Sequence, residues 1–132
     1  MKKIAFFCLM FTISLQAQNV QFADPLFKEA LIDIGVDANG DNEIQVSEAE
    51  AETYLDFLNY EFFDVSGLES FTNVTEIEFE DVTGIESLVL VDIPKLEILT
   101  IRDLQEMTNL EFSNLPKLKE LELGYRCNVE SV

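Results

Sequence analysis

The feature that most constrains this chain is an 11-residue spacing of apolar residues in its second half. Within each row of 11, apolar side chains occupy the first, fourth, sixth and ninth positions. The clean rows are Val74, Ile77, Phe79 and Val82; Ile85, Leu88, Leu90 and Ile93; Leu96, Leu99, Ile101 and Leu104; Met107, Leu110, Phe112 and Leu115; and Leu118, Leu121 and Leu123. A looser row precedes them, formed by Phe63, Leu68 and Phe71, and a candidate row before that contains Leu55, Phe57 and Tyr60. Self-similarity at a constant period predicts a repeat architecture.

A second period, twice as long, is superimposed on the first. The triplet Pro94-Lys95-Leu96 recurs two rows later as Pro116-Lys117-Leu118, and Asn73 stands in the slot that Lys95 fills one such period later. The structural unit is therefore predicted to be a 22-residue repeat that consists of two similar halves.

The fourth and sixth positions of each row alternate as in a strand, where every second side chain points to the same face. The predicted inward residues are Ile77, Phe79, Leu88, Leu90, Leu99, Ile101, Leu110, Phe112, Leu121 and Leu123. One coil cannot bury its own apolar face, so neighbouring coils must stack. An amphipathic helix also fits a period of 11, but Pro94 and Pro116 would break it, and the many Val, Ile, Thr and Phe residues favour strands.

This pattern resembles the leucine-rich repeat, specifically the short bacterial kind, the IRREKO class, in which both halves of each repeat carry LxxLxL. The resemblance covers about residues 63–132 and implies a short solenoid. It departs from the family at the ninth position of each row, where Asn is common and this chain has Val82, Ile93, Leu104 and Leu115. The turns must therefore satisfy their backbone groups in some other way.

Residues 1–17 have the features of a secretory signal peptide. Met1-Lys2-Lys3 precedes an apolar run from Ile4 to Leu15, and polar residues begin at Gln16. That run is too short for a membrane span, and no later segment approaches the roughly 20 apolar residues that spanning needs. We therefore expect a secreted protein, extracellular or at the cell surface, with no membrane span.

Acidic residues dominate the composition. The chain has 26 acidic and 8 basic residues, and removal of residues 1–17 takes away two lysines and no acids, which leaves a net charge of −20. Nucleic acid is excluded as a partner because its binding depends on neutralising phosphates with Lys and Arg. The chain has no histidine and no tryptophan, so we expect no enzyme. A carboxylate-based hydrolase is the remaining catalytic alternative, and it would require two carboxylates that share an apolar cleft.

A helical segment precedes the repeats. Asp24-Pro25 is a helix cap followed by proline at the first helical position, and the apolar residues that recur at helical spacing are Phe27, Ala30, Leu31 and Ile34. This predicts a helix over about residues 25–34. Ser47 is predicted to cap a second helix, with Glu50 at the capping-box position. Its packing residues would be Ala49, Ala51, Tyr54 and Leu55.

Between these helices, residues 37–48 read DANGDNEIQVSE and resemble the calcium loop of an EF-hand. The resemblance implies a Ca²⁺ site with ligands from Asp37, Asn39, Asp41, the Glu43 carbonyl, Gln45 and Glu48. Ile44 stands at the eighth position, where the family keeps an apolar anchor. Asn42 replaces the usual glycine at the sixth position and is the non-glycine residue best able to adopt a positive φ. Oxygen ligands suit calcium better than a transition metal, and an acidic surface turn is the alternative. A single such loop favours a structural role for calcium.

The stacked coils would also create a recognition surface. With a 22-residue turn, one sheet is predicted to display Glu78, Thr100 and Glu122 in one column and Glu80 and Arg102 in the next. Rigid, repeated side chains of this kind suit an extended partner, either a protein or a cell-surface glycan. We therefore expect a non-catalytic binding or adhesion module. The alternative is a purely structural or fragmentary solenoid with no ligand of its own.

The sequence as a whole predicts an α+β fold in which an EF-hand-like helix-loop-helix cap is followed by a short leucine-rich-repeat β-solenoid. The expected divisions are a signal peptide over residues 1–17, the cap over 18–62 and the solenoid over 63–132. Val129 and Val132 stand at the first and fourth positions of a further row. Because the sequence stops within that row, we expect either a natural short form of the solenoid or a solenoid truncated at its C-terminus as part of a longer protein.

Overall fold

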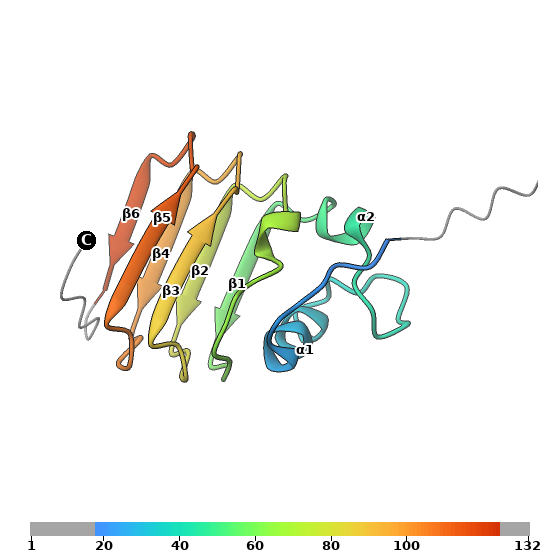
Figure 1. The fold of residues 1–132 in the computed structure, drawn as a ribbon, viewed down its shortest axis with the longest axis horizontal. Coiled ribbons are helices and arrows are strands. Elements are labelled where there is room, and N and C mark those ends of the chain that lie inside the picture. Colours follow the sequence, from blue (N-terminus) through green and yellow to red (C-terminus); the bar gives the residue numbers. More distant parts are fainter. Residues whose placement is uncertain (1–17, 125–132) are drawn as a thin grey trace, which may run out of the picture.

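The computed structural model describes residues 18–124, which form parallel β-coils preceded by a short helix (Figure 1). The elements in order are α1 (Pro25–Asp33), α2 (Val46–Ala49), β1 (Tyr54–Leu58), the 3-10 helix η1 (Leu68–Ser70), β2 (Glu76–Glu80), β3 (Ser87–Val91), β4 (Ile98–Arg102), β5 (Asn109–Ser113) and β6 (Glu120–Leu123). The predicted signal peptide over residues 1–17 and the row with Val129 and Val132 lie outside the described residues.

The strands form two parallel sheets that lie in separate layers (Figure 1). One sheet has the order β1-β2-β4-β6, and the other contains β3 and β5. Each strand pairs with the strand one full period away, so that Ile77 lies opposite Leu99 and Leu99 lies opposite Leu121. The predicted solenoid with a 22-residue repeat is therefore confirmed. Its pairing starts at β1, in the row that contains Leu55 and Phe57.

The apolar positions of the repeat form one continuous core between the two sheets. Seven of the ten predicted inward residues have 4% or less of their surface exposed: Ile77, Phe79, Leu88, Leu90, Leu99, Ile101 and Leu110. The other three also stand in the inward register, since Leu121 pairs with Leu99, Leu123 with Ile101 and Phe112 with Leu90. They are less buried, however: Leu121 and Leu123 are 36% and 40% exposed and Phe112 is half-buried. These three belong to β5 and β6, on which no later strand of residues 18–124 packs.

Helix α1 starts as the sequence predicts. The Asp24 carboxylate accepts a hydrogen bond from the Leu26 N–H at 2.9 Å, and Pro25 occupies the start of the helix. The other Asp24 oxygen, Oδ2, accepts the backbone N–H groups of Phe63 and Asp64. One buried carboxylate thus caps the helix and ties it to the loop that follows β1.

Aromatic packing joins α1 to the first coil. The ring centroid of Phe27 lies 5.5 Å from that of Phe57 and 5.1 Å from that of Phe62, and Phe57 stacks on Phe79 of the next coil at 5.3 Å. All four rings are fully buried. The helix therefore covers apolar surface of the first coil, as the end of a solenoid requires.

The second helix differs from its prediction. It consists of a single turn, Val46–Ala49, and its N-cap is Gln45 rather than Ser47. The Gln45 N–H donates to Glu48 Oε2 at 3.0 Å, so Glu48, and not Glu50, completes the cap. Tyr54 and Leu55 belong to β1, because the YLDFL segment alternates with a period of two and pairs with β2 along its whole length.

The turns that follow the strands are formed by Asn or Asp at the eighth position of the row, one position before the ninth, where the resembled family commonly has Asn. Five Asx residues, all at the eighth position of their row, adopt positive φ between 53° and 67°: Asn59, Asp81, Asp92, Asp103 and Asn114. Asx side chains tolerate this left-handed conformation better than other non-glycine residues. The N–H groups of Asn59, Asp81 and Asp92 continue the inter-coil ladder, with donor–acceptor distances of 3.0–3.2 Å.

Replacement of an inward leucine tests this core. Leu99 is fully buried between two coils, so Leu99→Ala is expected to lower the free energy of unfolding by about 2–5 kcal/mol through lost burial and a residual cavity. The matched control is Leu58→Ala, because Leu58 is 55% exposed at the end of β1, and it should cost less than about 1 kcal/mol. Urea unfolding monitored by circular dichroism measures both. Equal losses would contradict the assigned strand register.

Candidate functional site

The predicted face lies on the outer side of the four-stranded sheet. The parallel register places Glu78 opposite Thr100 and Thr100 opposite Glu122, and it places Glu80 opposite Arg102. The five residues therefore lie on neighbouring strands in adjacent columns.

Ion pairs hold the centre of this face together. The Arg102 guanidinium lies 2.9 Å from Glu122, 3.6 Å from Glu80 and 3.9 Å from Glu78. Hydrogen bonding and charge attraction from Glu122, with smaller contributions from Glu80 and Glu78, raise the pKa of Arg102 above its ordinary value. The single arginine of the face is thus paired with three carboxylates on its two neighbouring strands, β2 and β6. Thr100 beside it is buried, at 5% exposure.

Strand β1 adds residues to this face that the sequence did not assign to it. Its outward positions are Tyr54, Asp56 and Leu58, and Tyr54 and Leu58 are 45% and 55% exposed. Assignment of the Leu55–Phe57 row to the solenoid would have identified them. The outward residues of the whole sheet include six carboxylates, those of Asp56, Glu76, Glu78, Glu80, Glu120 and Glu122, against the one guanidinium.

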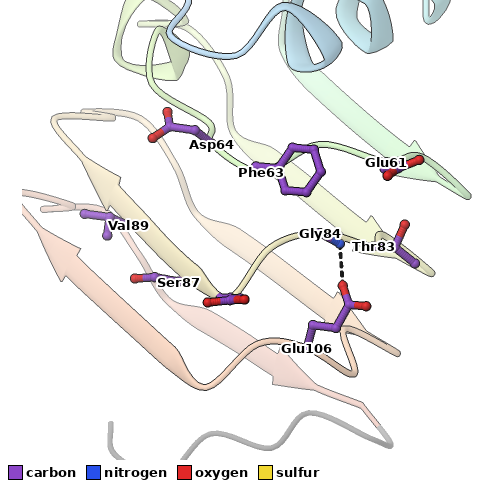
Figure 2. A pocket seen from close by; sticks show the side chains of 9 residues that line it. Glu61, Phe63, Asp64, Thr83, Gly84, Ser87, Val89 and Glu106 are labelled. Atoms are coloured by element: carbon purple, nitrogen blue, oxygen red, sulfur yellow. Dashed lines mark hydrogen bonds between the residues drawn. The ribbon is translucent and has the colours of Figure 1, made fainter.

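Carboxylates also meet in a cavity on a different side of the solenoid (Figure 2). It has a volume of about 670 Å³, and its lining includes Glu61, Asp64, Glu86 and Glu106 together with Phe63. All four acids are exposed.

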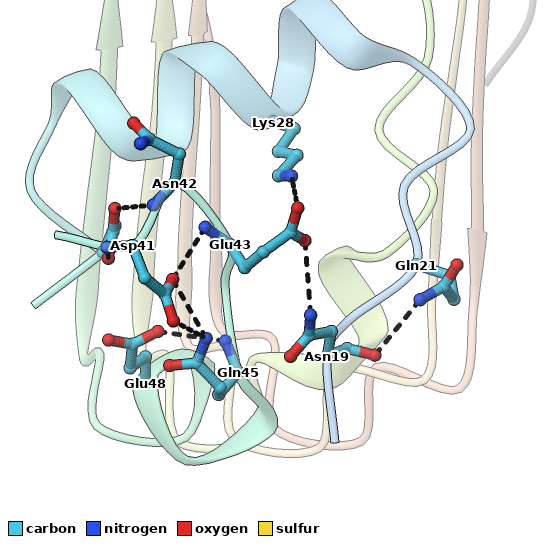
Figure 3. A network of polar contacts seen from close by, with 9 residues as sticks. Asn19, Gln21, Lys28, Asp41, Asn42, Glu43, Gln45 and Glu48 are labelled. Atoms are coloured by element: carbon cyan, nitrogen blue, oxygen red, sulfur yellow. Dashed lines mark hydrogen bonds and ion pairs between the residues drawn. The ribbon is translucent and has the colours of Figure 1, made fainter. Parts of the chain in front are cut away.

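The predicted calcium loop is closed by backbone N–H groups that donate to oxygens of its own side chains (Figure 3). Asp37 Oδ2 accepts the Asn42 N–H at 2.9 Å. The Asn39 amide oxygen accepts the Asp41 N–H, and the Asp41 carboxylate accepts the Glu43 N–H, both at 2.9 Å. Gln45 is buried and donates to the Asp41 carboxylate. These side chains therefore point toward the interior of one tight loop.

The side chains of Glu48 and Glu43 have different partners. Glu48 Oε1 accepts the N–H groups of Ala38 and Asn39 at 3.0 and 3.2 Å, so the last loop residue reaches back to the first few. The Glu43 side chain instead turns away and pairs with Lys28 at 2.9 Å (Figure 3). This orientation leaves the Glu43 carbonyl as the only oxygen of that residue able to act within the loop.

Two further features of the loop agree with its sequence. Asn42 adopts φ 62°, the left-handed conformation expected at the sixth position. Ile44, at the eighth position, is fully buried. A third feature was not predicted: the Val20 N–H donates to the Ile44 carbonyl and the Val46 N–H to the Gln18 carbonyl, both at 2.8 Å. These bonds tie the first described residues of the chain to the loop.

The donor set fits calcium in type and only partly in arrangement. All six predicted ligands are oxygen donors, as calcium prefers. However, no three His, Cys, Asp or Glu side chains within residues 18–124 lie close enough together to hold a metal ion. Asp37, Asp41 and Glu48 direct oxygens at backbone N–H groups, so their carboxylates would have to converge further around an ion.

Comparisons with known proteins add no relative, since no family model matches the chain and no curated protein matches it significantly. Within the described residues, no helix is long and apolar enough to cross a membrane.

Burial and the acidic face together raise the pKa of Tyr54. Partial burial, the negative charges of Asp56 and Glu78 and a hydrogen bond with Glu78 raise the pKa of Tyr54 to about 12. Absorbance titration of the phenolate should therefore show a transition near pH 12 that Tyr54→Phe removes. Because the folded-state pKa lies above the unfolded value of 10, this residue's contribution to stability is present below pH 10 and is lost as the pH rises toward 12.

Charge removal near the ring provides the control for this titration. Glu78→Gln should lower the pKa of Tyr54, whereas Glu111→Gln on β5, in the other sheet, should leave it unchanged. A Tyr54 transition near pH 10 in the folded wild-type protein would contradict the arrangement of the face.

Proposed function

We propose that this chain is a non-catalytic binding module, secreted or held at the cell surface, that recognises a positively charged segment of a partner protein. The observation that carries the proposal is the outer face of the β1-β2-β4-β6 sheet. Six carboxylates stand there in columns against one guanidinium, and that guanidinium is already paired with Glu78, Glu80 and Glu122. Complementary charge steers association and fixes register.

The sheet also offers the rigidity that recognition needs. The outward side chains come from four hydrogen-bonded strands over a close-packed core, so little order has to be gained on binding. Exposed Tyr54 and Leu58 supply apolar contact at the β1 edge. A protein partner is favoured over an acidic glycan, because an anionic polymer would be repelled by this face.

We further propose that the solenoid is of the leucine-rich-repeat type and that the loop over residues 37–48 holds calcium as an EF-hand-like site. The 22-residue period with two similar halves supports the first, and the positive φ of Asn42 and the buried Ile44 support the second. Calcium would be held by Asp37, Asn39, Asp41, the Glu43 carbonyl, Gln45 and Glu48. Its double charge would draw these oxygens together and stabilise the cap.

Calcium addition tests the metal site. A ligand that binds only the native state raises its stability by about 2.7 kcal/mol at a hundredfold excess over Kd, so the melting temperature should rise with calcium and fall with a chelator. Calorimetric titration should show saturable heat. Glu48→Gln should abolish both effects, because it removes one carboxylate while keeping an oxygen that can accept the loop N–H groups.

The control for this substitution is Glu50→Gln, an exposed acid just outside the loop, which should leave calcium binding intact. Absence of both binding heat and a melting shift at about 1 mM calcium, the range of extracellular sites, would make the loop an ordinary acidic turn.

Neutralisation of the sheet face tests the binding role. The chain from residue 18 onward, immobilised and exposed to cell-surface proteins, should retain partners that a Glu76→Gln/Glu120→Gln variant loses. These two acids lie on the face but make no ion pair with Arg102 within the described residues, so the network of the face stays intact. The loss should be at least about tenfold for a contact of two charges.

The matched control changes two acids elsewhere, Glu111→Gln and Glu69→Gln, and carries the same net charge as the face variant. Retention lost equally in both variants would reduce the effect to net charge, and retention unchanged in both would exclude the face. If no protein is retained by the wild type, with or without calcium, the solenoid has a structural role instead.

A further inference from the structure

The cavity of Figure 2 is built by three loops that the repeat places side by side. Glu61, Phe63 and Asp64 follow β1, the segment over residues 83–86 joins β2 to β3, and Glu106 lies between β4 and β5. Ser87 and Val89 of β3 complete the lining. We call it the loop cavity. It contains neither the calcium loop nor any residue of the acidic sheet face, so it is a separate surface of the molecule.

An exposed aromatic ring forms one wall of the loop cavity. Phe63 is 56% exposed, although most of the phenylalanines that the structure describes are buried in the core. Its ring lies against Gly84, where a Cβ atom would come within 2.9 Å of two ring carbons and of the Phe62 carbonyl oxygen. Gly84 also has φ +90°, a conformation that favours glycine. The backbone at Gly84 thus packs closely against one edge of the Phe63 ring, and the rest of the ring is open to solvent.

The charged residues of the lining are all acidic, beside neutral Thr83, Ser87 and Val89. Glu61, Asp64, Glu86 and Glu106 contribute four carboxylates, while no Lys or Arg of the described residues lines the loop cavity. None of the four takes part in the ion pairs found among residues 18–124. Glu106 is held in place because its Oε2 accepts the Gly84 N–H (Figure 2). A fixed carboxylate and an open ring therefore meet at the same glycine.

We propose that the loop cavity binds the side chain of an arginine presented by a partner protein. A guanidinium is planar, so it can stack on the Phe63 ring while its edge donates to carboxylates such as Glu106 and Glu86. A lysine ammonium lacks this planar fork. A divalent metal is disfavoured, because the acids here do not form a cluster of three able to hold one. The inference rests on the proposed binding role for its choice of a protein partner.

The test uses N-acetylarginine amide as the probe and the chain from residue 18 onward. In amide and aromatic NMR spectra, the Gly84 N–H and the Phe63 ring should shift saturably. The neutral isostere N-acetylcitrulline amide should bind about tenfold more weakly, because it cannot make charge-assisted hydrogen bonds. N-acetyllysine amide should bind about threefold more weakly than the arginine probe, because it cannot stack and donate together.

Two variants distinguish the contribution of the Phe63 ring from that of the Glu106 carboxylate. Phe63→Ala should weaken arginine binding about fivefold, whereas Leu58→Ala, which truncates an equally exposed side chain on the sheet face, should not. Glu106→Gln should weaken it to a similar degree while keeping an oxygen for the Gly84 N–H, with Glu111→Gln as its unchanged control. Folding of each variant is checked by circular dichroism.

Several results would overturn the proposal. These are non-saturable shifts spread over the acidic surface, equal binding of the arginine and citrulline probes, equal binding of the arginine and lysine probes, and binding that Phe63→Ala leaves unchanged. The outcome is independent of the sheet face, because Glu76→Gln/Glu120→Gln should leave probe binding intact. Arginine binding with an inactive sheet face would therefore contradict the proposed face and support the loop cavity, and the reverse result would do the opposite.

Discussion

Stacking of one coil's apolar side chains on the next is the interaction on which the rest of this structure depends. Each coil has apolar residues on the inner side of both of its strands and no means of covering its own flanks. Only the neighbouring coil provides that cover, and the core consequently runs without a break from Phe27 in α1 to Leu110 in β5. The surfaces available for binding are the surfaces that this stacking leaves outside.

The N-terminal cap belongs to the same core and is not a separate attachment. Phe27 packs on Phe57 and Phe62, and the Asp24 carboxylate bonds to the loop after β1. Lys28 on α1 pairs with Glu43 in the loop over residues 37–48. Any event that tightens that loop therefore acts on groups connected directly to the first coil, and local stability there is coupled to the stability of the repeats.

The parts of the fold that were predictable are those specified by a periodic pattern. The 11-residue spacing of the rows and the 22-residue spacing of paired rows were enough to identify the solenoid. They also identified the columns of outward residues on the sheet and most inward residues, because each contact between coils repeats an earlier one. The second helix was mispredicted, because Ser47–Glu50 and Gln45–Glu48 have the same capping spacing and because the long-range pairing of β1 with β2 is not visible in local propensity. The left-handed Asx turns were missed because the family pattern places its Asn one position later.

The candidate sites also differ in how far they could be predicted from local sequence. Residues of the loop over 37–48 could be named in advance, because their order within one short segment carries the signal. The burial of Thr100 depends on neighbours in other coils, and the loop cavity depends on three loops that meet only after stacking. To predict such features, one must know which side chains contact one another between coils. A single sequence with two alternating kinds of row does not specify these contacts.

The left-handed Asx residues imply a rule for how such a gene can change in length. Asn59, Asp81 and Asp103 occupy one corner of successive coils, and Asp92 and Asn114 occupy the opposite corner, each set spaced by one full coil. Duplication of a 22-residue segment would add a coil and leave every later residue on its original sheet. Duplication of a single row would preserve the apolar frame and the turns, yet it would transfer every later outward side chain to the other sheet. A half-repeat insertion would therefore exchange the outward side chains of the two sheets while keeping the apolar spacing that builds the core.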